Sequence, residues 1–146
     1  PWGDHNLYKS FGPAVHNENR NNLVFNAGTL SGDFDTMLDL FLNVFMFCGG
    51  APRYVEGGGG PDQAALNVLL NLEPYKSITR FTMSEEGWAA QLGTTGPQVN
   101  FPVVEPKPLL KPSGVVTTST GVPFVMVHQY DRVTEWKKTI EDLYVE

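Results

Sequence analysis

Cysteine is almost absent from this chain of 146 residues, because Cys48 is the only one. An intrachain disulfide is therefore excluded, and so is a zinc site built from several thiolates. Basic residues are also few: 10 Lys and Arg stand against 16 Asp and Glu, which gives a formal net charge of −6. The basic residues are scattered rather than clustered, so we expect no nucleic-acid partner.

Long apolar runs are missing as well. The longest, residues 37–48, is interrupted by Asp39 and Asn43 and is too short to span a bilayer, so we expect no membrane span in this chain. The first residues lack the basic and then apolar layout of a signal peptide, and no initiator methionine is present. We therefore expect the chain to begin inside a longer gene product or after processing. The sequence motifs of serine hydrolases, helical zinc proteases and P-loop nucleotidases are absent.

Hydrophobic residues make up 41% of the sequence, which is enough for one packed core, so we expect residues 1–146 to form a single domain. Residues 1–22 are polar and Asn-rich, and they predict an irregular segment. The short apolar run 23–25 predicts a buried strand that ends in a loop. Phe34, Leu38, Phe41, Leu42 and Phe45 recur at three- and four-residue steps on one face, which predicts a helix over 33–47 with Ser31 or Asp33 as its cap.

The rest of the chain predicts alternating helices and strands. Asp62 is expected to cap a helix that runs to about Asn71, and Pro74 to interrupt the chain after it. Prolines between residues 94 and 123 favour an extended path. The further predicted elements are a hairpin of strands 77–83 and 88–92, a strand at 115–118, a buried strand at 124–127 and a helix at 133–144. The fold class we expect is therefore mixed α/β.

Three polar clusters follow an apolar strand or begin a helix, where side chains on a rigid scaffold can meet in one pocket. They are Asn26-Ala27-Gly28, Pro61-Asp62-Gln63 and His128-Gln129-Tyr130-Asp131. Each has a purely structural alternative: a turn at Asn26 and Gly28, a helix cap at Asp62, and a hydrogen-bonded core histidine at His128.

In this order the three clusters resemble the retaining glycosyltransferases of the GT-A fold, the family of glycogenin and the bacterial lipopolysaccharide galactosyltransferases. The family has an Asn-Ala-Gly or Asn-Ser-Gly triplet at a strand end, then Asp-Gln before a helix with Leu-Asn, as in residues 62–67, and later a histidine at a strand end. The resemblance covers residues 23 to 131. It implies the C-terminal, acceptor and sugar half of a GT-A fold, a mixed sheet with flanking helices.

The resemblance also implies roles for individual residues. Asp62 would accept hydrogen bonds from hydroxyls of the donor sugar, and the Gln63 amide would lie near the anomeric carbon, where it stabilises positive charge. His128 would bind the Mn²⁺ or Mg²⁺ ion that holds the diphosphate. The substrate-binding set that follows from the resemblance is Asn26, Ala27, Gly28, Gln129 and Tyr130. The implied partners are a nucleotide-sugar donor and a glycan acceptor.

The sequence departs from the family's pattern at two points. Residues 1–22 do not contain the upstream Asp-x-Asp metal motif, and the Lys-Pro-Trp that follows the metal histidine is replaced by Asp131-Arg132. Asp33-Phe34-Asp35 has the right letters, but it lies downstream and begins a helix, where acids are favoured for structural reasons. An upstream nucleotide-binding half is therefore expected elsewhere in the protein.

Two other functions stay open. One is a non-catalytic module, derived from a partial transferase fold, that binds carbohydrate or protein. The other is a hydrolase, which needs two carboxylates on either side of one bond, and only Asp62 with Glu56 or Asp131 offers such a pair.

Overall fold

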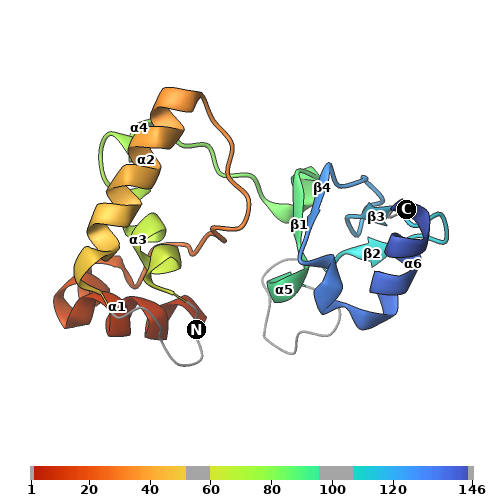
Figure 1. The fold of residues 1–146 in the computed structure, drawn as a ribbon, viewed down its shortest axis with the longest axis horizontal. Helices are drawn as coiled ribbons and strands as arrows, with labels where there is room; N and C mark the ends of the chain where they lie inside the picture. The colour runs from red at the N-terminus through yellow and green to blue at the C-terminus, as the bar shows by residue number, and fades with distance from the viewer. Residues whose placement is uncertain (1, 52–59, 96–106, 145–146) are drawn as a thin grey trace. The chain divides into compact units, whose positions relative to one another are not determined.

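The computed structural model describes residues 2–51, 60–95 and 107–144. They divide into two compact units, residues 1–80 and residues 81–146, where the sequence predicted one domain. The first unit is helical and the second carries the strands (Figure 1), so the fold class is mixed α/β, as predicted. Within the described ranges, no helix has both the length and the apolar character needed to cross a membrane.

The first unit begins with a helix where the sequence predicted an irregular segment. Helix α1 spans Trp2–Asn19, and Gly12 (φ 78°) kinks it just before Pro13. Leu7, Phe11 and Val15 recur every fourth residue and pack against helix α3, which spans Pro61–Leu69. The prediction failed because a Gly-Pro pair usually ends a helix, whereas here this apolar stripe continues across the kink.

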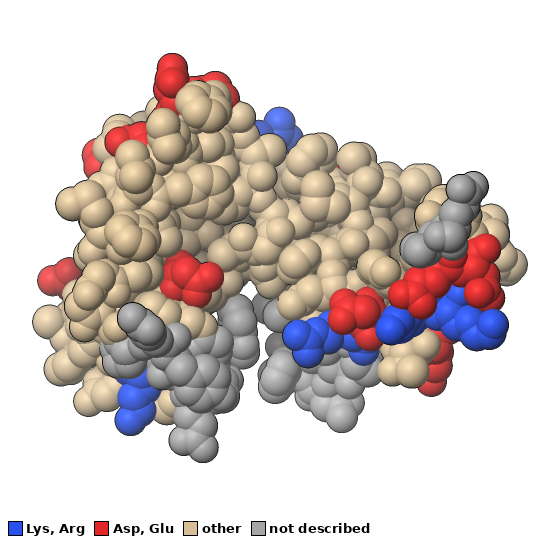
Figure 2. All heavy atoms as spheres, viewed as in Figure 1, with Lys and Arg blue, Asp and Glu red and all other residues tan. Residues whose placement is uncertain are grey.

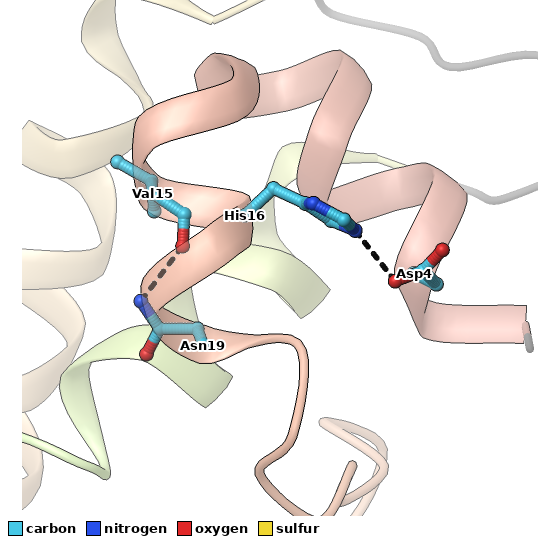
Figure 3. A network of polar contacts seen from close by, with 4 residues as sticks. All are labelled: Asp4, Val15, His16 and Asn19. Atoms are coloured by element: carbon cyan, nitrogen blue, oxygen red, sulfur yellow. Dashed lines mark hydrogen bonds and ion pairs between the residues drawn. The ribbon is translucent and has the colours of Figure 1, made fainter.

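Polar contacts join the two halves of α1 (Figure 3). The His16 Nε2 atom lies 2.6 Å from the Asp4 Oδ1 atom, across the kink. The Asn19 side chain donates to the carbonyl of Val15 at 2.9 Å, one turn back in the last turn of the helix. The kinked helix is therefore held by an imidazole–carboxylate contact as well as by its apolar stripe.

Helix α2 spans Phe34–Phe47, close to the predicted range, and a 3-10 turn follows at Cys48–Gly50. Asp33 caps its N-terminus by accepting a hydrogen bond from the backbone N–H of Thr36 at 3.0 Å, so the capping role predicted for Asp33 is confirmed. Leu40 is the buried residue of this helix, and the apolar stripe marked by the sequence lies on another face.

Tyr75 ties α2 to the short helix α4, Tyr75–Ile78. Its hydroxyl donates to the Asp39 carboxylate at 2.5 Å and accepts from the Asn43 side chain at 2.9 Å. Burial and the neighbouring Asp39 carboxylate raise the pKa of Tyr75, so the phenol stays a donor at neutral pH.

Helix α3 confirms the helix predicted after the glycine run, but its cap differs. Gly60 occupies the N-cap position and Pro61 begins the helix, so Asp62 lies in the first turn and is not the cap. The strand predicted at 23–25 is wrong, because these residues join no sheet. Their backbone bonds to side chains of α3 instead, as described below.

The second unit contains two small sheets. Strands β1 (Ala89–Gln91) and β4 (Met126–His128) pair in parallel, with Gln91 opposite His128. Strands β2 (Leu109–Leu110) and β3 (Val116–Thr117) pair antiparallel. The predicted strands at 88–92 and 115–118 are thus confirmed in shortened form.

Other predictions for this region are wrong. The hairpin partner expected at 77–83 does not exist, because α4 covers residues 77–78, residues 79–83 belong to no strand, and the 3-10 turn Ser84–Glu86 follows them. The strand expected at 124–127 starts later, and Val125 and Met126 are exposed rather than buried. The segment predicted to be extended, residues 94–123, begins inside α5 (Leu92–Thr95). Residues 107–123 contain β2, β3 and turns, and residues 96–106 lie outside the described ranges.

Helix α6, Thr134–Tyr144, matches the predicted C-terminal helix. Val133, Trp136 and Ile140 pack on the core of this unit, which is formed by Ala90, Leu92 and Val116. Charged side chains of both signs alternate on the outer surface of the unit (Figure 2), and they include the pairs Lys137–Glu141 and Lys138–Asp142. Such exposed pairs contribute little stability.

Candidate functional site

Two side chains of α3 hold the backbone of residues 25–27. Gln63 and Asn67 are four residues apart and so lie on the same face of the helix. The Gln63 Oε1 atom accepts from the backbone N–H of Ala27 at 2.9 Å, and its amide nitrogen donates to the carbonyl of Phe25. Asn67 accepts from the backbone N–H of Phe25 at 2.7 Å and donates to the carbonyl of the same residue at 2.8 Å. We call this set of bonds the amide clamp.

The amide clamp explains why an extended segment exists outside a sheet. Partly buried backbone N–H and C=O groups need hydrogen-bond partners, and a strand normally finds them on a neighbouring strand. Here the two carboxamides supply both a donor and an acceptor, as a neighbouring strand does. The clamp joins two of the motifs that the sequence singled out, although Ala27 and Gln63 lie 36 residues apart.

The loop that the clamp fixes presents polar groups. The Asn26 Oδ1 atom accepts from the backbone N–H of Gly28 at 2.6 Å and closes a local turn. Gly28 is exposed and Asn26 is half-buried. The structural alternative of a turn is therefore correct for these two residues, and the turn leaves the donor nitrogen of the Asn26 amide available to a ligand.

Asp62 is exposed in the first turn of α3, next to Gln63. A carboxylate there is favoured by the partial positive charge of the helix N-terminus. Gly60 leaves room for it, because a Cβ at that position would lie 2.6 Å from the Asp62 Oδ1 atom. Asp62 is thus an exposed acceptor group in the first turn of α3, one residue before Gln63.

A small cavity lies behind the clamp, between α1 and α3. Its volume is about 30 Å³, which holds a water molecule or two but no sugar ring. The polar side chains that line it are all carboxamides: Asn6, Asn19, Asn22, Gln63 and Asn67. The side chain of Asn6 also donates to the carbonyl of Gly60 at 3.0 Å and so braces the start of α3.

Sequence reasoning missed the part that Asn6 and Asn67 play. The resemblance gives Asn67 no role beyond its place in the Leu-Asn motif. Its spacing of four residues from Gln63 nevertheless indicates that the two side chains share a helix face. Asn6 lies in a stretch taken as irregular, and nothing in the local sequence connects it with Gly60.

The remaining predicted site residues lie in the second unit. His128 ends β4 and is half-buried. Gln129 follows in the left-handed region (φ 57°), an uncommon conformation for a residue other than glycine and one that often marks functional loops. The side chain of Gln129 covers Gly93, where a Cβ would meet its Oε1 atom. The Tyr130 hydroxyl donates to the Glu141 carboxylate at 3.4 Å.

The predicted residues thus form two groups, each described within its own unit. The first unit bonds Ala27 of the Asn26-Ala27-Gly28 triplet to Gln63, which follows Asp62 in the chain, and the second unit holds His128, Gln129 and Tyr130. Asp33-Phe34-Asp35 has the structural role expected of it. The backbone N–H of Thr36 lowers the pKa of Asp33, as expected for a cap. Glu56, one candidate for a hydrolase pair, lies outside the described ranges.

A divalent metal ion needs several donor side chains close together. Across the described ranges, no three His, Cys, Asp or Glu side chains lie close enough to hold an ion. His128 offers one imidazole nitrogen, and its chain neighbours Gln129 and Tyr130 are weaker ligands for such an ion. These residues alone do not make a complete metal site.

The chain was compared with protein families, curated proteins and solved structures. No family model, no curated protein and no solved structure matches this chain.

Proposed function

We propose that the chain takes part in glycosyl transfer from a nucleotide-diphosphate sugar to a glycan or other acceptor, as the sugar-handling half of a GT-A-type transferase. The observation that carries this proposal is the bond from the backbone N–H of Ala27 to the Gln63 side chain, which joins two motifs of that family. An upstream half would supply the nucleotide site and most metal ligands. The product would keep the anomeric configuration of the donor.

The geometry gives each residue of the first unit a distinct part. Asp62 accepts hydrogen bonds from sugar hydroxyls, since it is exposed and acceptor-only. Asn26 donates through its amide nitrogen, and Gly28 lets the ligand approach the backbone. Both polar atoms of the Gln63 side chain form hydrogen bonds with the loop backbone, so the main role of Gln63 is to position Ala27. Its part in stabilising charge at the anomeric carbon stays a prediction that follows from the resemblance.

The second unit contributes through the loop after β4. His128 would supply one ligand to a Mn²⁺ or Mg²⁺ ion, whose charge would offset that of the diphosphate, and the other ligands would come from outside the described residues. Gln129 and Tyr130 would contact the substrate. These assignments rest on the order of motifs in the chain and on the left-handed backbone at Gln129.

Calorimetric titration tests the proposal. UDP-sugars are titrated, with and without Mn²⁺, into this chain joined to the upstream half, and we expect binding that depends on the metal. Asp62→Asn should weaken binding of the sugar nucleotide at least about tenfold, because a charge-assisted acceptor is lost. The matched control is Asp35→Asn, which also removes a carboxylate from the first turn of a helix in the first unit and should change nothing.

Other results would contradict the proposal. Equal effects of Asp62→Asn and Asp35→Asn would remove Asp62 from the sugar site, and metal dependence unchanged in His128→Ala would remove His128 from the metal site. Binding of glycans without nucleotide or metal would favour the non-catalytic module instead. Release of free sugar from a glycoside, lost in Asp62→Asn, would favour a hydrolase.

A further inference from the structure

Helix α2 has an apolar face that is exposed in the described part of the first unit. Four residues at alternating four- and three-residue steps form it, and their exposed fractions are 78% for Phe34, 46% for Leu38, 51% for Phe41 and 77% for Phe45. We call these four residues the α2 stripe. Leu40 is the buried residue of the helix, on the opposite side. Hydrophobic stripes this exposed usually mark an interaction surface.

The spacing of the α2 stripe is that of a coiled-coil seam. Steps of four, three and four residues follow the alternation of four and three by which the core positions of a heptad recur. When two such helices pair antiparallel about a two-fold axis between Leu38 and Phe41, Phe34 meets Phe45 of the other copy and Leu38 meets Phe41. Every member of the stripe then has an apolar partner, so the surface is complementary to itself, as a two-fold interface requires.

The exposed area is large enough for such a pair. A phenylalanine has roughly 200 Å² of surface, so the three phenylalanines of the stripe leave roughly 400 Å² exposed on each chain. Leu38 and the adjacent Leu42, which is 54% exposed, add to this area. Two copies would together bury roughly 1,200 Å², which is the lower end of the range for specific interfaces.

The charges around α2 decide between the two directions of pairing. Asp33, Asp35 and Asp39 lie in the N-terminal half of the helix or at its start, whereas the C-terminal end through Gly50 carries no charge. Figure 2 shows acidic side chains gathered at the end of the first unit where α2 begins. Parallel pairing would bring the acids of both copies together. Antiparallel pairing sets the two copies of Asp33 roughly 20 Å apart along the helix and the two copies of Asp35 roughly 13 Å apart, beyond the screening distance at physiological salt, and it also opposes the helix dipoles. Asp39 lies near the two-fold axis, but it is off the stripe and its carboxylate accepts from the Tyr75 hydroxyl.

We propose that the α2 stripe is a homodimer interface, in which two copies of this chain pair antiparallel through α2. The interface is small and apolar, so the dimer is weak and dissociates on dilution.

Sedimentation equilibrium of the whole chain over a range of concentrations tests the proposal. We expect a single association step from 16.1 kDa to twice that mass. Phe45→Lys should raise the dissociation constant at least about tenfold, because a two-fold axis places the charge in the interface twice. The matched control is Met46→Lys, which adds the same charge at a 74% exposed apolar residue of the same helix but off the stripe, and should leave association unchanged.

A charge swap tests the direction of pairing. Phe34→Glu and Phe45→Lys should each weaken the dimer, and the double variant should recover part of the loss, because antiparallel pairing sets the two introduced side chains opposite each other. Circular dichroism checks that each variant keeps its helix content. A chain that stays monomeric at every concentration, growth beyond a dimer, or an unchanged dimer in Phe45→Lys would each overturn the proposal. A double variant weaker than both single variants would overturn the antiparallel direction.

Discussion

Gln63 and Asn67 take the place of a strand partner for residues 25–27, and the candidate site depends on these two side chains. Gln63 is buried, and the N–H of Ala27 bonds to its amide oxygen. The carbonyl of Phe25 has a second donor in Asn67, so the N–H of Ala27 depends on Gln63 more than the carbonyl does. Local sequence predicts neither bond, because both link segments that lie far apart in the chain.

Truncation of Gln63 therefore has a defined cost. Gln63→Ala leaves the N–H of Ala27 without its acceptor, and we expect the free energy of unfolding to fall by about 1–3 kcal/mol. Urea denaturation followed by circular dichroism measures it. The matched control is Asn71→Ala, because Asn71 also donates from a carboxamide to a backbone carbonyl, that of Asn67 at 2.7 Å, but joins no distant segment. Equal losses in both variants would show that the clamp does not stabilise the fold.

Asp4 and His16 allow a prediction of pH dependence. The hydrogen bond with His16 is the main cause that lowers the pKa of Asp4 below its ordinary value of 3.8. A carboxyl whose pKa is lower in the folded state stabilises the fold above its unfolded pKa and loses this contribution as the pH falls through the folded pKa. Asp4→Asn should therefore lower the urea midpoint at pH 7, and the difference from the natural chain should shrink and vanish as the pH falls below 3.8, through the lowered pKa of the folded state.

The effect is small because Asp4 is open to solvent. Asp35→Asn is the control, since it removes an equal charge from the first turn of α2. A pH-independent difference for Asp4→Asn would mean that the carboxylate charge plays no part in holding the kink of α1.

At the scale of elements, the sequence predicted the helices with strong apolar periodicity and failed where tertiary contacts decide. Helices α2 and α6 appear close to the predicted bounds. Periodicity could not show which side of α2 would be buried, because Leu40 and the stripe of Phe34, Phe41 and Phe45 lie on different faces of a largely apolar helix. In α1, the packing of Leu7, Phe11 and Val15 on α3 overrides the weak local preference for helix.

Gly87 shows how a single position sets the path of strands in the second unit. It ends the 3-10 turn Ser84–Glu86 with φ 74°, and its carbonyl accepts from the N–H of Val125 at 2.9 Å. A Cβ at Gly87 would lie 2.8 Å from the Val122 side chain and 3.1 Å from the backbone oxygen of Pro123. The turn therefore requires glycine both for its backbone conformation and for space.

A comparison of two glycines separates these requirements. Gly121 also has a positive φ, of 91°, but nothing lies within 4 Å of a Cβ there. We expect Gly121→Ala to cost about 1–2 kcal/mol from backbone strain alone, and Gly87→Ala to cost at least about 1 kcal/mol more because the backbone of Pro123 must move. Thermal and urea unfolding of both variants measure the difference. Similar losses of unfolding free energy in the two variants would mean that the segment after β3 moves away from a Cβ at Gly87 without destabilising the fold.

At the scale of the whole molecule, sequence reasoning identified which motifs matter better than it identified how they are held. The link between the Asn26-Ala27-Gly28 triplet and Gln63 appears within the first unit, as the order of motifs implied. The expectation of one domain came from length and composition, which do not show that the apolar residues collect around two centres. Those centres are Leu7, Ala64 and Val68 in the first unit, and Ala90, Leu92, Val116 and Val133 in the second.

Two separate cores predict two separate responses to destabilisation. Leu66, in the first unit, is 2% exposed, and Leu92, in the second, is fully buried, so truncation of either to alanine should cost about 2–5 kcal/mol within its own unit. Hydrogen exchange followed by mass spectrometry measures the response. Leu66→Ala should speed exchange in residues 1–80 and Leu92→Ala in residues 81–146, because protection reports the stability of the local cooperative unit. If either variant instead speeds exchange equally along the whole chain, the two cores unfold as one, and the single domain expected from composition is the correct description.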